Sequence, residues 1–187
     1  MAKFNVAVVV GSNRRGSINR KLAQALAVLA GDRVATKFVR IDDLPIYSQD
    51  LESPLPAGVA RLKAEIEQAD GLLVVTPEHN RSIPALLKNA IDWAARPYGR
   101  NSWSGRPAAI IGTSPGAIGT AVAQQHLRQV LGNLGAVVMG GEAYVTFRQG
   151  LIDDADAITD EGTRKFLQAF IDQFVSFVGR QSVSRAA

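Results

Sequence analysis

The sequence predicts an α/β protein built on one open, parallel β-sheet with helices on both faces. Short apolar runs, rich in valine and isoleucine, alternate five times with longer segments of helical periodicity. The runs are almost continuously apolar, which is typical of strands buried on both faces. Such alternation favours parallel strands joined by right-handed helical crossovers.

In chain order, the strands are expected at residues 4–10, 34–41, 72–76, 108–112 and 136–139. The first strand ends at Gly11, and Ser17 or Asn19 can cap a helix that continues through residue 30. The second strand is β-branched and ends in a turn, which a proline-containing extended connection follows.

Four further helices are expected at residues 58–69, 84–95, 119–133 and 159–178. The helix at 58–69 places Val59, Leu62 and Ile66 on one face. The next helix has Pro84 at its expected first position, where the missing N–H is not needed. A polar, basic excursion at 96–107 precedes the fourth strand.

Length and composition limit the possible functions. With 187 residues, one domain is expected over 1–180, followed by a disordered tail at 181–187. The absence of cysteine excludes disulfides, thiolate metal ligands and cysteine nucleophiles, and no metal site is expected. No apolar run is long enough to span a membrane, so a cytoplasmic protein is expected. The net charge of +4 comes from dispersed basic residues, which favours a small anionic ligand over nucleic acid.

A polar loop at 11–19 joins the first strand to the first helix. Backbone N–H groups at a helix N-terminus favour an anion. Ser12, Ser17 and Asn19 add neutral donors, and Arg14 or Arg15 adds positive charge, which together suit a phosphate monoester. The loop lacks both the G-x-G-x-x-G and the G-K-[ST] patterns. A polar turn with a serine cap is the alternative.

Two more ligand-type loops follow the third and fourth strands. Residues 77–80, Pro-Glu-His-Asn, can place backbone amides along a planar heterocycle with the flat ring of His79 beside it. His79 as a surface side chain and Glu78 as a general base or a structural group are the alternatives. The loop at 112–119 is rich in small residues that allow a close backbone approach. In a sheet of order 2-1-3-4-5, all three loops lie at one edge, where such sheets bind ligands.

These loops together resemble the NADPH-dependent FMN reductase family, flavodoxin-like enzymes that include quinone and chromate reductases. The resemblance covers about residues 4–145. It depends on the loop at 11–19 and on a motif that runs from Pro77 through Ser82, Pro84 and Leu87–Ala90 to Asp92 and Trp93. The chain departs from the family at His79, where a tyrosine is common.

The resemblance implies a flavodoxin-like fold and an FMN site. The FMN phosphate would lie on Ser12, Arg14, Ser17, Ile18 and Asn19. The isoalloxazine would contact Pro77, Glu78, His79 and Asn80, with Ser114 near its edge. In this family the flavin carries the chemistry, so no catalytic side chain is expected. Arg100 or Arg96 in the basic excursion is expected to attract the nicotinamide nucleotide or an anionic acceptor such as chromate.

The function predicted from this resemblance is an FMN-dependent NAD(P)H oxidoreductase with NADPH or NADH as co-substrate. Quinones or similar small molecules, and chromate among them, are the expected acceptors. A flavodoxin-like electron carrier without substrate turnover is the alternative, and an anion-binding module without a flavin is a third. A homodimer or homotetramer is expected, with subunit contacts through Gln125, His126, Arg128 and the segment around Glu142.

Overall fold

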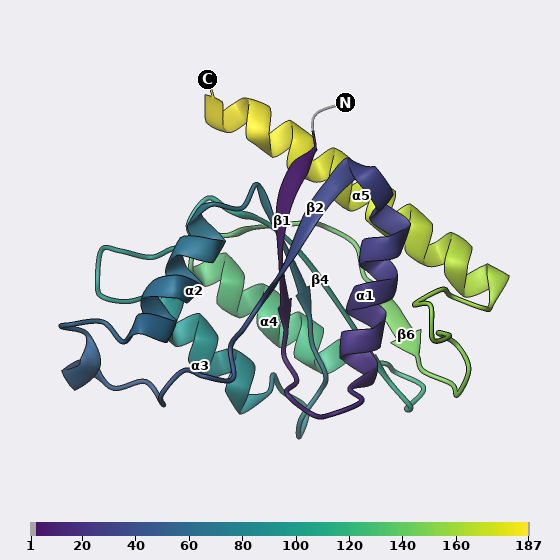
Figure 1. The fold of residues 1–187 in the computed structure, drawn as a ribbon, viewed down its shortest axis with the longest axis horizontal. Coiled ribbons are helices and arrows are strands. Elements are labelled where there is room, and N and C mark those ends of the chain that lie inside the picture. Colours follow the sequence, from purple (N-terminus) through teal and green to yellow (C-terminus); the bar gives the residue numbers. More distant parts are fainter. Residues whose placement is uncertain (1–2, 187) are drawn as a thin grey trace.

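The computed structural model describes residues 3–186, with side chains described through Ser182. One parallel sheet has the strand order β2-β1-β3-β4-β5, and helices cover both faces (Figure 1). The strands are β1 Phe4–Val10, β2 Val34–Val39, β3 Gly71–Val75, β4 Pro107–Ser114, β5 Val137–Val138 and β6 Tyr144–Thr146. The helices are α1 Ile18–Ala30, α2 Ala57–Glu67, α3 Ala85–Ala94, α4 Ala121–Asn133 and α5 Glu161–Ala186, with 3₁₀ turns η1 Gly31–Arg33 and η2 Gln49–Leu51. The predicted fold class and strand order are confirmed.

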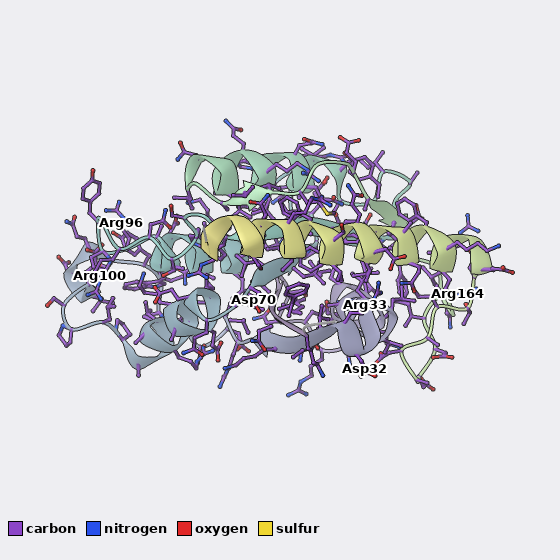
Figure 2. The ribbon with its side chains drawn as sticks, turned by 90° about the horizontal axis from the view of Figure 1, so that it is seen from above. Asp32, Arg33, Asp70, Arg96, Arg100 and Arg164 are labelled. Atoms are coloured by element: carbon purple, nitrogen blue, oxygen red, sulfur yellow. The ribbon has the colours of Figure 1, made fainter. Side chains whose placement is uncertain are left out.

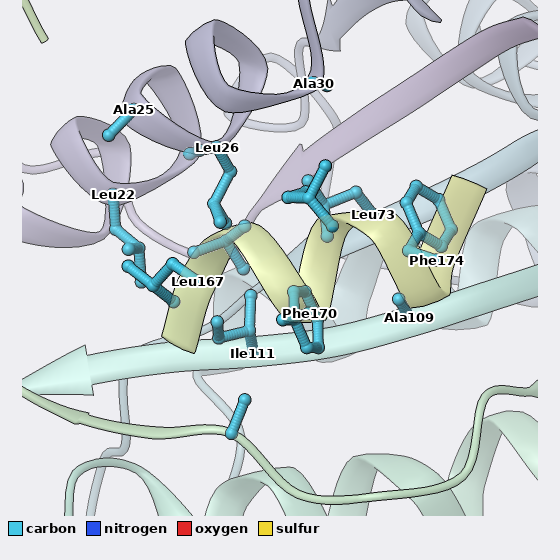
Figure 3. Packing of buried hydrophobic residues seen from close by; sticks show 14 of the residues in the cluster. Leu22, Ala25, Leu26, Ala30, Leu73, Ala109, Ile111, Leu167, Phe170 and Phe174 are labelled. Carbon is cyan, nitrogen blue, oxygen red and sulfur yellow. The ribbon is translucent and has the colours of Figure 1, made fainter. Parts of the chain in front are cut away.

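The strands bury both of their faces, in two separate hydrophobic clusters. In β1, Val6, Val8 and Val10 belong to the cluster shared with α1 and α5, whereas Ala7 and Val9 belong to the cluster shared with α2, α3 and α4. This follows from the period of two in a strand, which directs successive side chains to opposite faces. Figure 3 shows the first cluster, in which leucines of α1 meet Leu167, Phe170 and Phe174 of α5 above the sheet.

Helix α1 begins where the sequence predicts. The Ser17 hydroxyl accepts a hydrogen bond from the N–H of Arg20 at 3.3 Å, as a helix-capping serine does. Pro84 was expected as the first residue of α3, and this was wrong by one position. It is the capping residue, with φ −60° and ψ 145°, because the extended loop before the helix continues through it.

Strand β4 is longer than predicted, and the sequence analysis missed β6. Gly112 to Ser114 continue β4 because they pair with Tyr144 to Thr146 of β6. Gly112 is required there, because a Cβ atom would lie 2.0 Å from the carbonyl oxygen of Thr76. The first three residues of the predicted third loop, 112–114, therefore form the end of β4.

Helix α5 continues through Ala186, beyond its expected end at residue 178, and the last residue of the tail expected at 181–187, Ala187, lies outside the described residues. It is also the longest helix of the chain segment that the structure describes. None of the helices in residues 3–186 is both long and apolar enough to cross a membrane.

Candidate functional site

The three predicted ligand loops meet in one cleft at the carboxyl edge of the sheet. The cleft has a volume of about 420 Å³ and is lined by residues from the segments 11–19, 77–86 and 113–115. Nine of the predicted site residues line it: Ser12, Arg14, Ser17, Ile18, Asn19, Pro77, Glu78, His79 and Ser114. The topology explains this convergence, because β1, β3 and β4 are neighbours in the sheet and end at the same edge.

One end of the cleft offers uncommitted donors to an anion. The N–H groups of Ile18 and Asn19 open α1 and find no acceptor in residues 3–186. The Arg14 guanidinium makes one long contact, 3.4 Å to the carbonyl oxygen of Gly16. Among the described residues, the Ser12 hydroxyl has a single bond, which it accepts at 3.4 Å from the N–H of Arg14. This set suits a phosphate monoester at a helix N-terminus.

The side chain of Asn19 is not available to a phosphate, contrary to the expectation that it adds a donor there. It is buried, its Nδ2 donates to the carbonyl oxygen of Thr113 at 2.9 Å, and its Oδ1 accepts from the N–H of Thr113 at 3.0 Å. The amide thus ties the first loop to the end of β4. Asn19 can contribute to the anion site only through its backbone.

The second loop is a tight two-residue turn. His79 and Ser82 exchange both backbone hydrogen bonds, at 3.0 and 2.9 Å. Between them, Asn80 and Arg81 have φ values of 50° and 61°, which asparagine tolerates better than arginine. His79 is exposed and lines the cleft, whereas Asn80 lies at the tip of the turn and does not line it.

The Glu78 carboxylate points out of the cleft toward helix α4. Its Oε2 accepts from the N–H groups of Val122 and Ala123 at 3.0 and 3.1 Å, and its Oε1 pairs with Arg81 at 3.0 Å. Thr120 precedes α4 without capping it by its side chain, so Glu78 takes that function from a different loop. Glu78 is therefore structural, and its possible role as a general base is not supported.

A second contact holds the same loop to α4. The Ser82 hydroxyl lies 2.8 Å from Nδ1 of His126. With Glu78, this contact fixes the second loop at both ends of its turn. The ring end of the cleft is thus built on a rigid element.

Ser114 in the third loop also has an internal partner. Its hydroxyl donates to the carbonyl oxygen of Gly119 at 2.5 Å, which closes the turn between β4 and α4. Gly119 has a φ of 58°, and a Cβ atom there would lie 3.1 Å from the backbone nitrogen of Val145. The compact loop leaves Thr113, Ser114 and Pro115 along the edge of the cleft.

The structure does not bring Arg100 to this cleft. Helix α3 begins beside the cleft at Ala85, and the chain leaves the helix at its other end before reaching Arg100. Figure 2 shows Arg96 and Arg100 together at one end of the molecule. The Arg100 carbonyl oxygen accepts a 2.6 Å bond from Nζ of Lys63, which also donates to the Ala94 carbonyl oxygen and to Ser102. Burial lowers the pKa of Lys63, although Glu67 opposes this shift.

Sequence reasoning missed several lining residues, including Gly11, Asn13 and Pro84 to Leu86. Leu86 has no polar group that would mark it as part of a site. It enters the cleft because α3 starts directly at this edge of the sheet. The apolar helix start and the proline give this part of the cleft a surface suited to a planar ring.

Comparison with known proteins identifies the family of this chain. The family model of NADPH-dependent FMN reductase matches residues 4–150. A 2-hydroxy-1,4-benzoquinone reductase of Burkholderia sp is 52% identical over 176 residues, which are 94% of this chain and 96% of that protein. A quinone reductase of Escherichia coli (strain K12) is 36% identical over 186 residues, which are 97% and 98% of the two chains.

Solved structures of other proteins share the fold of this chain. The flavoenzyme NAD(P)H:(acceptor) oxidoreductase FerB from Paracoccus denitrificans superposes with a TM-score of 0.93 at 49% identity, covering 95% of this chain and 98% of that one. A flavodoxin mutant from Pseudomonas aeruginosa, 19% identical with a TM-score of 0.58, shares the fold. The match over residues 4–150 and the similarity to the quinone reductases show that the chain belongs to the NADPH-dependent FMN reductase family.

Proposed function

We propose that this chain is an FMN-dependent NAD(P)H oxidoreductase that passes electrons from NAD(P)H through bound FMN to quinones or similar small acceptors. Bound FMN supplies the redox chemistry by accepting a hydride and releasing electrons to the acceptor. The protein binds and orients the flavin and its substrates.

The observation that carries this proposal is the single cleft formed by three loops with different chemistry. The N-terminus of α1, Ser12 and Arg14 suit the FMN phosphate. Pro77, His79 and the start of α3 suit the isoalloxazine, and Ser114 lies along the edge. The side chains of Asn19 and Glu78 support the loops, so their expected contribution to the flavin is through the backbone.

The visible spectrum of the purified protein tests the cofactor and the reaction together. We expect a yellow protein, or one that becomes yellow on incubation with FMN and gel filtration, whose flavin absorbance bleaches when NADPH is added without oxygen. A protein that retains no flavin would contradict the proposal and favour the anion-binding alternative.

A flavodoxin-like carrier without substrate turnover is the second candidate, because the fold is shared with flavodoxin. Steady-state oxidation of NADPH with 1,4-benzoquinone and no partner protein separates the two. Turnover is expected here, whereas a carrier would require a reductase.

Quinones are the proposed acceptor class because two of the relatives described above are named for them.

We also propose a cytoplasmic homodimer or homotetramer. Gln125, Arg128 and His126 have partners within the chain, so they do not supply the free polar contacts expected for an interface. Ile118, Val122 and Tyr144 instead leave exposed apolar surface close to the third loop. Sedimentation at micromolar concentration tests the assembly.

A further inference from the structure

A second cavity lies next to the flavin cleft, on the side of strand β2. It has a volume of about 440 Å³. Ser12, Asn13, Arg14 and Leu86 line both spaces. A ligand in the cleft can therefore extend past the first loop into this space, which we call the β2 cavity.

The β2 cavity has two arginines without an acidic partner. The Arg20 guanidinium carbon lies 4.6 Å from the ring centre of Phe38, in a cation–π contact that holds the side chain at the cavity wall. Neither Arg20 nor Arg14 forms an ion pair with any carboxylate of residues 3–186. Their charges are therefore available to an anion.

The third arginine of the cavity is neutralised. Arg40 pairs with Asp42 at 2.8 Å and lies 3.9 Å from Asp43. The hydrogen bond from Arg40 is the largest cause of a lowered pKa for Asp42, which further favours the charged form of this carboxylate. An anion is therefore directed away from Asp42 and toward Arg14 and Arg20.

The chemistry of the β2 cavity fits a phosphate monoester attached to a flat ring system. Arginine forks bind phosphate oxygens in pairs, and apolar walls such as Phe38 and Leu86 can cover an aromatic base. A ligand that also reaches the flavin cleft under the proposed function is the nicotinamide dinucleotide. NADPH differs from NADH by one phosphate monoester on its adenosine ribose.

We propose that the β2 cavity binds the adenosine 2′-phosphate of NADPH through Arg20, with Arg14 shared between this phosphate and that of FMN. This inference rests on the proposed function and assigns the co-substrate preference to a named side chain. Arg20 lies outside the flavin cleft, so its replacement separates recognition of the phosphate from the chemistry of the flavin.

Steady-state kinetics of the FMN-loaded enzyme with NADPH and NADH tests the assignment. We expect Arg20→Gln to raise the KM for NADPH about tenfold, as for loss of one charge-assisted contact, with the KM for NADH within about twofold and kcat unchanged. Arg180→Gln is the matched control. Arg180 is an exposed arginine of α5 that bonds to Ser176, and its removal changes the net charge equally. Equal effects on both co-substrates, or no effect on either, would overturn the assignment.

A binding measurement gives a readout that does not depend on turnover. Titration calorimetry of the FMN-loaded protein should show adenosine 2′,5′-bisphosphate binding at least about tenfold more tightly than 5′-AMP, with this difference lost in Arg20→Gln. Arg20→Lys retains the charge but not the planar fork and should lose part of the difference. A difference between the two adenosine phosphates that is unchanged in Arg20→Gln would overturn the proposal.

The two measurements separate the possible failures. Absence of flavin reduction by either co-substrate would contradict the proposed function. Normal reduction together with equal binding of the two adenosine phosphates would contradict the β2 cavity assignment alone.

Discussion

Glu78 joins the second loop of the cleft to helix α4. Its carboxylate accepts both N–H groups that begin α4, although it belongs to the loop after β3. Together with the contact between Ser82 and His126, this side chain fixes the second loop relative to α4.

Replacement of Glu78 by alanine should weaken FMN binding as well as stability. Two helix N–H groups lose their acceptor, which costs about 1–3 kcal/mol of unfolding free energy. The second loop also loses one of its two attachments to α4 and keeps the contact between Ser82 and His126, so the FMN dissociation constant should rise. Urea unfolding of the apoprotein and flavin fluorescence titration measure the two effects.

Arg81→Ala is the control for this change. It removes the exposed ion pair with Glu78 but leaves the bonds to α4 intact. We expect the free energy of unfolding to fall by at most about 1 kcal/mol and the FMN dissociation constant to change little. If Glu78→Ala weakened FMN binding no more than Arg81→Ala does, the anchoring role would be wrong.

At the scale of elements, Lys63 of α2 holds the segment between α3 and β4. Its buried ammonium donates to two carbonyl oxygens, of Ala94 and Arg100, and to the Ser102 hydroxyl. The Ser102 hydroxyl in turn donates to Glu67 at 2.6 Å. The basic excursion predicted from the sequence is thus a fixed element of the structure.

Lys63→Met should loosen this segment and leave the cleft intact. The methionine keeps an unbranched apolar stem but removes the donor to the Arg100 carbonyl oxygen, at a cost of about 1–3 kcal/mol of unfolding free energy, whereas the Ala94 carbonyl oxygen keeps its bond from the N–H of Ser102. Limited proteolysis should then cut within 95–106 faster than in the parent protein, while FMN affinity stays the same. Lys88→Met removes only an exposed pair with Asp92 and serves as the control. Equal rates of proteolysis in the two variants would show that Lys63 does not hold the segment between α3 and β4.

The elements also show what the sequence could predict. The main strands could be predicted because short, continuous apolar runs are typical of strands that are buried on both faces of a parallel sheet. Strand β6 could not, because three residues carry little periodicity and their pairing with β4 is a tertiary contact. The same limit applies to the site. Asn19 and Glu78 have the residue types of a ligand site, but their side chains bond to partners 94 and 44 to 45 positions away.

Arg100 shows the converse problem. It is close in sequence to the second loop, and proximity in sequence suggested a role in the site. Helix α3 carries the chain away from the cleft before this residue is reached. No sequence pattern within residues 96–107 indicates that Arg100 lies beyond the far end of α3, away from the cleft.

At the scale of the whole molecule, α5 closes the core on one face and is fixed to the α1–β2 junction. Arg33 of η1 pairs with Asp172 of α5 at 2.6 Å, and Gln168 donates to the same carboxylate oxygen at 2.8 Å. These bonds lower the pKa of Asp172 below its ordinary value of 3.8, with the bond from Arg33 as the largest cause.

Asp172→Asn should therefore lower stability in a pH-dependent way. A carboxylate whose pKa is depressed by folding stabilises the protein above 3.8, and this contribution is lost as the pH falls through the lower folded value. Because the pair is half-exposed, Asp172→Asn should have a free energy of unfolding less than about 1 kcal/mol below that of the parent protein at pH 7. This loss should shrink in high salt. Urea unfolding at pH 7 and near pH 3 measures it. Glu161→Gln, which removes an exposed pair with Lys165 on the same helix, is the control. A difference that persisted unchanged in acid would show that the interaction is not ionic.

The buried bond pair between Asn19 and Thr113 has a consequence for how the protein meets its flavin. It joins the first loop to β4 through protein atoms alone, so the cleft has its shape before any ligand enters. Association should then resemble docking into a preorganised receptor, with little ordering entropy lost on binding. Amide hydrogen exchange at Thr113 should accordingly be slow in the apoprotein and hardly change on addition of FMN. A large gain in protection there would indicate that the flavin itself assembles its own binding site.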